Sequence, residues 1–211
     1  MKVYTFYSES HSVLYELFSK SILETNPGLE IETDTLPQEG SGSFMEEGWE
    51  KTMNKKVDQI IRACEIGEIF IHSDCDVFFF RNIEKEILDE LGNFDIAFQD
   101  DGIVGMCMGF FICKPSPIVT ELFKEVKSIL PRFQGHDQNA LNSIISKYPI
   151  KYKRLSRLFF NYGQFGKGVW NGESFSVDPN ILILHANWTI GVENKVKLID
   201  HVSSKILELE R

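Results

Sequence analysis

Short apolar runs rich in β-branched and aromatic residues alternate along this chain with longer segments of helical periodicity. The apolar runs predict strands at residues 2–7, 29–35, 68–72, 94–99, 108–114 and 181–185. Helices are expected at about residues 11–25, 50–66, 83–92, 116–130, 137–147 and 193–210. This alternation is typical of an α/β domain, so we expect a mostly parallel central sheet flanked by helices.

Two segments interrupt the pattern. Residues 37–43 read as a loop rich in glycine and serine, and residues 156–176 contain Gly163, Gly166, Gly168 and Gly172 without regular periodicity. Because glycine is costly to hold in one conformation, the second segment is a candidate lid that orders over a ligand. No repeat or linker divides the chain, so we expect one domain over all 211 residues. Its charged end lacks a helix stop signal, as expected for the first domain of a longer polypeptide.

Composition and charge narrow the function classes. Hydrophobic residues make up 43% and charged residues 25%, an ordinary globular mixture that excludes a disordered chain. With 31 acidic and 22 basic residues the net charge is −9, which disfavours nucleic acid and anionic membranes as partners. The apolar stretch 103–113 is too short to span a membrane, and the first ten residues lack a signal-peptide core. The four cysteines are expected to be buried and reduced, so the predicted location is cytoplasmic.

The first chemical signal is the tripeptide Asp74-Cys75-Asp76, which lies between two apolar runs. In extended chain, residues two apart face the same side, so both carboxylates project together while Cys75 faces the core. Two such carboxylates cannot both stay ionised without a cation, and Mn²⁺ or Mg²⁺ would satisfy them and leave positions for phosphate oxygens. The alternative is a solvated turn in an acidic protein.

His185 ends the apolar run 181–185 and is followed by Lys195. A histidine at a strand end is often only a structural hydrogen-bonding group, but an imidazole can also complete a mixed oxygen and nitrogen ligand set. Lys195 can then face a diphosphate as a point charge.

Other polar positions have both a structural and a functional interpretation. Asp137, followed by Gln138, suits a helix N-cap, and Asp100-Asp101 suits a plain turn after a strand. Lys56 belongs to a solvated helix or reaches an anionic ligand.

The order of these features resembles the nucleotide-diphospho-sugar transferase family of GT-A glycosyltransferases from the first strand to Lys197. The resemblance rests on a strand with Thr5 and Tyr7, a helix with Lys56, and the segments SDCDVFF, FQDD, MGFF, HDQNAL and HANWTIGVENK. It implies a single GT-A (Rossmann-like) domain. About residues 1–100 would bind the nucleotide, and about residues 101–211 would bind the sugar and the acceptor.

The resemblance also implies roles for particular residues. Asp74, Asp76 and His185 would bind Mn²⁺ or Mg²⁺. The residues implied to contact the nucleotide sugar are Thr5, Tyr7, Lys56, Ser73, Asp74, Gly191 and Lys195. Those implied to line the donor sugar and acceptor, where transfer occurs, are Asp100, Asp101, Asp137 and Gln138. The family often has a polar residue such as Asn where this chain has Met108, which changes the expected contact with the sugar ring.

The implied activity is transfer of a hexosyl or deoxyhexosyl group from a nucleotide diphosphate sugar, expected to be UDP-linked, to a glycan or glycoprotein. Retention of configuration is expected, whereas inversion would need Asp137 or Asp101 as a base. A non-catalytic nucleotide-sugar-binding module would use the same metal residues. An aspartyl-nucleophile phosphatase is disfavoured, because that motif normally lies on the first strand and residues 2–7 contain no acid.

Overall fold

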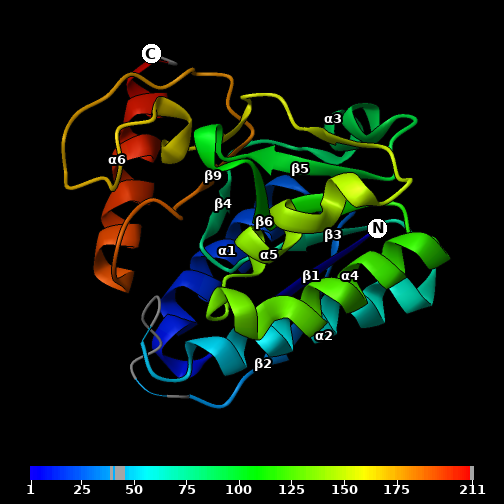
Figure 1. The fold of residues 1–211 in the computed structure, drawn as a ribbon. Coiled ribbons are helices and arrows are strands. Elements are labelled where there is room, and N and C mark those ends of the chain that lie inside the picture. Colours follow the sequence, from blue (N-terminus) through cyan, green and yellow to red (C-terminus); the bar gives the residue numbers. More distant parts are fainter. Residues whose placement is uncertain (39, 41–45, 210–211) are drawn as a thin grey trace.

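A six-stranded sheet with the order β2-β1-β3-β6-β5-β7 forms the centre of the computed structural model, which describes residues 1–38, 40 and 46–209 (Figure 1). The strands are β1 (Lys2–Tyr7), β2 (Glu30–Thr35), β3 (Phe70–Ser73), β5 (Ile96–Asp100), β6 (Met106–Cys113) and β7 (Tyr152–Arg154). Strand β1 is parallel to β2 and β3, and β5 is parallel to β7, whereas β6 is antiparallel to β3 and β5. The expected α/β fold is therefore confirmed, with a mostly but not purely parallel sheet.

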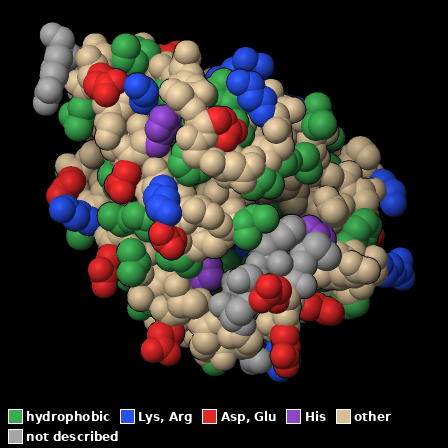
Figure 2. Space-filling view, turned by 90° about the vertical axis from the view of Figure 1, so that its left-hand side faces the viewer, with side chains coloured by type: hydrophobic (Ala, Val, Ile, Leu, Met, Phe, Trp, Pro, Cys, Tyr) green, Lys and Arg blue, Asp and Glu red, His purple; other side chains and the backbone are tan. Residues whose placement is uncertain are grey.

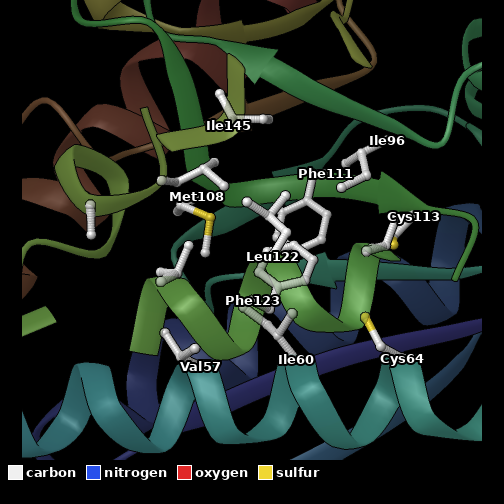
Figure 3. Packing of buried hydrophobic residues seen from close by; sticks show 14 of the residues in the cluster. Val57, Ile60, Cys64, Ile96, Met108, Phe111, Cys113, Leu122, Phe123 and Ile145 are labelled. Atoms are coloured by element: carbon white, nitrogen blue, oxygen red, sulfur yellow. The ribbon is translucent and has the colours of Figure 1, made fainter. Parts of the chain in front are cut away.

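Helices cover both faces of this sheet because each presents an apolar stripe to it (Figure 1). One face packs against α2 (Trp49–Ile66), α4 (Pro117–Ile129) and α5 (Asp137–Ile144). In that core Phe111 of β6 stacks on Phe123 of α4, and Val57, Ile60 and Leu122 belong to the same cluster (Figure 3). The other face packs against α1 (Ser12–Thr25) and α3 (Glu84–Leu91).

A second, three-stranded sheet with the order β4-β9-β8 lies beside the first. Its strands are β4 (Val77–Phe79), β8 (Phe159–Asn161) and β9 (Ile183–His185). Val77 pairs with His185 in the antiparallel β4–β9 ladder, and Asn161 pairs with His185 in the parallel β8–β9 ladder. The chain passes from the central sheet to the second sheet at Asp74–Asp76, so the acidic tripeptide lies where the two sheets meet.

The prediction that 156–176 is irregular throughout is wrong for the first half of that segment. Strand β8 and the 3-10 turn Tyr162–Phe165 occupy it, because Phe159 and Tyr162 are apolar enough to be fully buried. Strand β7 was also missed. Residues 166–176 keep the expected irregular character, and Gly166, Gly168 and Gly172 all have positive φ.

The other expected elements are confirmed to within a few residues, including the last helix α6 (Val192–Leu209). Residues 39 and 41–43 of the predicted loop 37–43, and Glu210 at the predicted helix end, lie outside the described residues. All four cysteines are buried and free. No described helix is long and apolar enough to cross a membrane. Seen from the side of α6, acidic and basic side chains are interspersed (Figure 2).

Candidate active site

Two adjoining cavities, of about 130 and 470 Å³, open at the edge where β1 and β3 end and β6 begins. Ligands bind at this carboxyl edge in open α/β sheets. Both cavities are lined by Asp74, Asp76 and Lys195, while Tyr7 lines only the smaller one and His185 only the larger one. The structure thus brings together residues that the sequence placed at three separate strand ends.

Asp74 and Asp76 face the cavity from the turn between β3 and β4, and Cys75 packs into the core as predicted. The backbone fixes this turn, because Asp74 N donates to Gly109 O at 2.7 Å and Ala186 N donates to Asp76 O at 3.0 Å. Ligand atoms of Asp74, Asp76 and His185 lie within 4.8 Å of one another. Two hard oxygen ligands and one imidazole nitrogen suit a divalent cation such as Mn²⁺.

Gly109 of β6 makes room for this cluster. A β-carbon built at this position would overlap His185 Cε1 and would lie 2.6 Å from Asp74 Oδ2. Only a residue without a side chain therefore lets the carboxylate and the imidazole approach one another. The requirement at Gly109 supports a site whose function depends on that close approach.

Lys56 is buried beneath the acidic turn, with 2% of its surface exposed. Its Nζ lies 2.9 Å from Asp74 Oδ1 and 3.0 Å from Asp137 Oδ2. Burial disfavours the ammonium, but the charges of Asp137 and Asp74 outweigh it and raise the pKa of Lys56 above its usual value. Lys56 thus remains charged and links the acidic turn to the start of α5.

Asp76 has two cationic neighbours. Lys195 forms an ion pair with Asp76 Oδ2 and also donates to Ala186 O at 3.1 Å, while His185 Nε2 lies 3.1 Å from Asp76 Oδ1. Burial would raise the pKa of Asp76, but Lys195 and His185 hold it well below its usual value. Burial would lower the pKa of His185, but Asp76 raises it to about 10. In the metal-free protein these cations therefore neutralise the carboxylate.

Asp101 organises the far end of the larger cavity. It is 3% exposed and accepts from Gln138 Nε2 at 2.8 Å, Trp188 Nε1 at 2.6 Å and Asn187 Nδ2 at 3.2 Å. Trp188 reaches it across Gly163, where a β-carbon would overlap the indole. Both Asp101 oxygens are thus occupied, which orients Gln138 and Trp188 along the cavity wall.

Three residues singled out from the sequence line neither cavity. Thr5 is buried in the sheet, where its carbonyl accepts from Gln59. Ser73 Oγ donates to Asp74 O at 3.0 Å, and Asp100 pairs with Arg154 at 2.8 Å. Their implied contacts with the donor or the acceptor stay predictions.

Tyr7 lines the smaller cavity and Gly191 lines the larger one. Tyr7 stacks on Tyr15 with ring centroids 4.2 Å apart, which fixes one wall of the smaller cavity. Gly191 has a φ of 83° and directly precedes α6. Met108 borders the larger cavity, but its side chain is fully buried in the helix-side core (Figure 3).

Several cavity residues were missed by the sequence analysis. Trp49 and Met53 of α2 were missed and line both cavities, whereas Lys56 of the same helix was predicted and lines the larger one. Their spacing of i, i+4 and i+7 places them on one helix face, so helical periodicity read outward from Lys56 would have identified them. Asn187 belongs to the segment HANWTIGVENK but was given no role, and Val169 carried no comparable signal because its position depends on loop conformation.

Three solved structures with a similar fold are glycosyltransferases. A glycosyltransferase involved in the glycosylation of the major capsid of PBCV-1 has a TM-score of 0.65 and 13% identity, covering 94% of this chain and 98% of that one. The galactosyltransferase LgtC in complex with donor and acceptor sugar analogs has a TM-score of 0.52 and 13% identity, covering 94% and 95%. The glycosyltransferase GlyE of Streptococcus pneumoniae TIGR4 has a TM-score of 0.58 and 13% identity, and this chain covers 59% of its length.

At these identities the structural likeness shows the shared fold. No curated protein sequence matches this chain significantly. The sequence model of the nucleotide-diphospho-sugar transferase family matches residues 17–199, which include the acidic turn, the Asp137 helix and His185. The chain therefore belongs to the nucleotide-diphospho-sugar transferase family and is a glycosyltransferase of the GT-A fold.

Proposed function

We propose that this chain is a divalent-metal-dependent glycosyltransferase that moves a sugar from a UDP-sugar to a glycan or glycoprotein acceptor, with retention of configuration. The observation that carries the proposal is the cluster of Asp74, Asp76 and His185 around the space left by Gly109. Its oxygen and nitrogen atoms fit Mn²⁺ or Mg²⁺, so these three side chains would hold the cation. When bound, the cation neutralises charge on the departing nucleoside diphosphate.

The smaller cavity suits the nucleoside. Phe6, Tyr7 and Trp49 give it aromatic walls, and Asp74 and Asp76 also line it. An aromatic base gains stacking energy on such walls while its diphosphate lies toward the carboxylate pair. The choice of uridine rests on the family resemblance.

Lys195 is the group that meets the diphosphate in this proposal. In the metal-free protein it neutralises Asp76. With a cation held by Asp74, Asp76 and His185, the Lys195 ammonium would no longer be needed to neutralise Asp76 and would be free to contact the phosphate oxygens. Gly191, which lines the cavity next to the start of α6, lets the diphosphate approach the backbone closely. Lys195 thus stabilises negative charge on the leaving group.

Retention is supported by how the sugar-side carboxylates are engaged. Inversion needs a carboxylate that deprotonates the acceptor hydroxyl. Asp101 accepts three hydrogen bonds, and Asp137 is paired with buried Lys56, so both are held by protein donors. Gln138, oriented by Asp101, borders the same cavity and would position the sugar and the acceptor without removing a proton.

The test is transfer of labelled sugar from a panel of UDP-, GDP- and TDP-sugars to glycan and glycoprotein acceptors, with Mn²⁺ or with EDTA. We expect sugar to leave at least one UDP-sugar, to an acceptor or slowly to water, and EDTA to abolish this release. An aryl phosphate serves as the control substrate for a phosphatase. Release from no nucleotide sugar, or hydrolysis of the aryl phosphate alone, would contradict the proposal.

A further inference from the structure

Gln99, at the end of β5, is fully buried and contacts the ring of His185. The distance from its Oε1 to His185 Nδ1 is 2.8 Å. The β5–β6 ladder shifts register between Phe98 and Gln99, so the strand has an irregularity at the residue that reaches the site. Such bulges turn individual side chains toward active sites. Here the bulge directs Gln99 to the contact between the two sheets.

The orientation of the Gln99 amide follows from the chemistry of its neighbours. Its Nε2 lies 3.2 Å from Phe159 O and 3.1 Å from Phe160 O. Carbonyl oxygens only accept hydrogen bonds, so the NH₂ group must face them and Oε1 must face the imidazole. The reverse orientation would set an amide oxygen against two carbonyl oxygens inside the protein. Gln99 therefore presents an acceptor to His185.

An acceptor at Nδ1 requires that the Nδ1 atom of His185 carry a proton. Cys107 Sγ, 3.7 Å from the same nitrogen, can also accept weakly, so this contact is compatible with the same assignment. The other nitrogen, Nε2, lies 3.1 Å from Asp76 Oδ1 and 4.0 Å from Asp74 Oδ2. It is the ring atom that faces the carboxylates, so it is the one that would bind a cation between them after losing its proton.

We infer that Gln99 is a positioning residue that holds His185 in the Nδ1–H tautomer and fixes its ring so that Nε2 binds the divalent cation. Metal-binding histidines generally donate their second N–H to such a partner. The inference rests on the proposed metal-dependent function. Strand β8 contributes to this positioning, because the carbonyls of Phe159 and Phe160 orient the Gln99 amide, which in turn orients the His185 ring.

The test compares Gln99→Met with the matched control Gln164→Met. Methionine has nearly the length of glutamine but neither donates nor strongly accepts. Gln164 Nε2 also donates to Phe159 O, at 3.1 Å, yet Gln164 does not contact His185. We expect the Mn²⁺ dissociation constant, measured by calorimetric titration without nucleotide, to rise about 10–100-fold in Gln99→Met. In Gln164→Met it stays within about twofold of wild type.

If Gln99 had only a structural role, Gln99→Met and Gln164→Met would lose Mn²⁺ affinity equally. The variant Gln99→Glu further distinguishes a structural role from a positioning role. The glutamate keeps an acceptor for Nδ1–H, and its protonated carboxyl can still donate to Phe159 O or Phe160 O, so it should recover part of the lost Mn²⁺ affinity. Independently of any variant, ¹⁵N NMR of the Mg²⁺- and UDP-bound wild type should show His185 protonated at Nδ1 and unprotonated at Nε2.

Three results would overturn the inference. A proton on Nε2 in the Mg²⁺-bound wild type would show that His185 has the opposite tautomer. Unchanged Mn²⁺ affinity in Gln99→Met would show that Gln99 does not position His185. Both leave the proposed glycosyltransferase function intact. Absence of Mn²⁺ and Mg²⁺ binding by the wild-type protein itself would instead remove the metal site, and the inference with it.

Discussion

Lys195, near the start of α6, forms an ion pair with Asp76, a carboxylate that also faces His185. The ammonium thus occupies a position beside Asp76 that a divalent cation would compete for. We expect a bound cation to weaken this pair, because it would share in neutralising Asp76, and Lys195 would then be free to contact the diphosphate. Metal and nucleotide are therefore expected to bind more tightly together than either binds alone.

The variant Lys195→Met tests this competition. It leaves Asp76 with His185 as its remaining cationic neighbour, so the metal-free protein should lose up to about 3 kcal/mol of stability. Added Mn²⁺ should restore most of that loss, and Mn²⁺ alone should bind more tightly than to wild type. UDP affinity at saturating Mn²⁺ should fall. Thermal melts and Mn²⁺ and UDP titrations measure these quantities. A parallel fall in Mn²⁺ and UDP affinity would contradict the competition.

Gly109→Ala is expected to damage the site more than the fold. Its β-carbon would overlap His185 Cε1 and crowd Asp74 Oδ2, so the ligands must move apart. Overpacking of this kind costs about 1–3 kcal/mol, and Mn²⁺ affinity should fall at least tenfold. Gly28→Ala is the control, since its β-carbon meets only the flexible end of Glu84. Normal Mn²⁺ titration of folded Gly109→Ala would show that the close approach is not needed.

The pKa of His185 predicts how pH affects stability and metal binding. In the folded, metal-free protein Asp76 raises it from 6.5 to about 10. A raised pKa stabilises the fold fully below pH 6.5, and this contribution is lost as pH rises toward 10. Because the metal must replace the Nε2 proton, Mn²⁺ affinity should rise with pH, by up to about tenfold per unit. Titrations between about pH 6.5 and 8.5 should show this slope in wild type. An equal slope in His185→Gln would assign it to another group.

The segment 166–172 is expected to become protected when donor binds. Val169 lines the larger cavity, and Lys167 beside it is exposed. Tryptic cleavage after Lys167 should slow when Mn²⁺ and UDP-sugar are added together, whereas cleavage after Lys151, which lines neither cavity, should not. Equal rates of cleavage after Lys167 with and without donor would show that this segment does not act as a lid. Trp170 is a poor fluorescent reporter of this change, because its side chain is already buried without the donor and its indole already donates to Glu173 O.

The sequence predicted the fold well because strand runs such as 2–7 and 108–114 are apolar enough to require burial on both faces. It failed at β8, where four glycines over 156–176 outweighed the short apolar run around Phe159. The number of glycines in a segment indicates how flexible it is in the unfolded chain. Strand β8 forms because it pairs with β9, which is distant in the sequence, and local composition does not reveal that pairing.

At the site, the metal-ligand candidates could be predicted because Asp74 and Asp76 are two residues apart in extended chain and His185 ends an apolar run. Their electrostatics could not. The sequence suggested two repelling carboxylates, but Lys56 and Lys195 reach them from α2 and α6 and neutralise them. Removal of either carboxylate should therefore destabilise the metal-free protein.

The most direct test of the account is the melting temperature with and without Mn²⁺ plus each of a panel of nucleotide sugars. It compares wild type with Asp74→Asn, Asp76→Asn and His185→Gln, and uses the exposed remote change Asp89→Asn as control. At about 100 times its dissociation constant, a bound donor adds roughly 2.7 kcal/mol, or a shift of about 5–10 °C for a domain of this size. We expect that shift in wild type and Asp89→Asn with at least one UDP-sugar, and its loss in the three site variants. A wild-type protein that no combination of Mn²⁺ and nucleotide sugar stabilises, or site variants that are stabilised as much as wild type, would contradict the metal-dependent transferase.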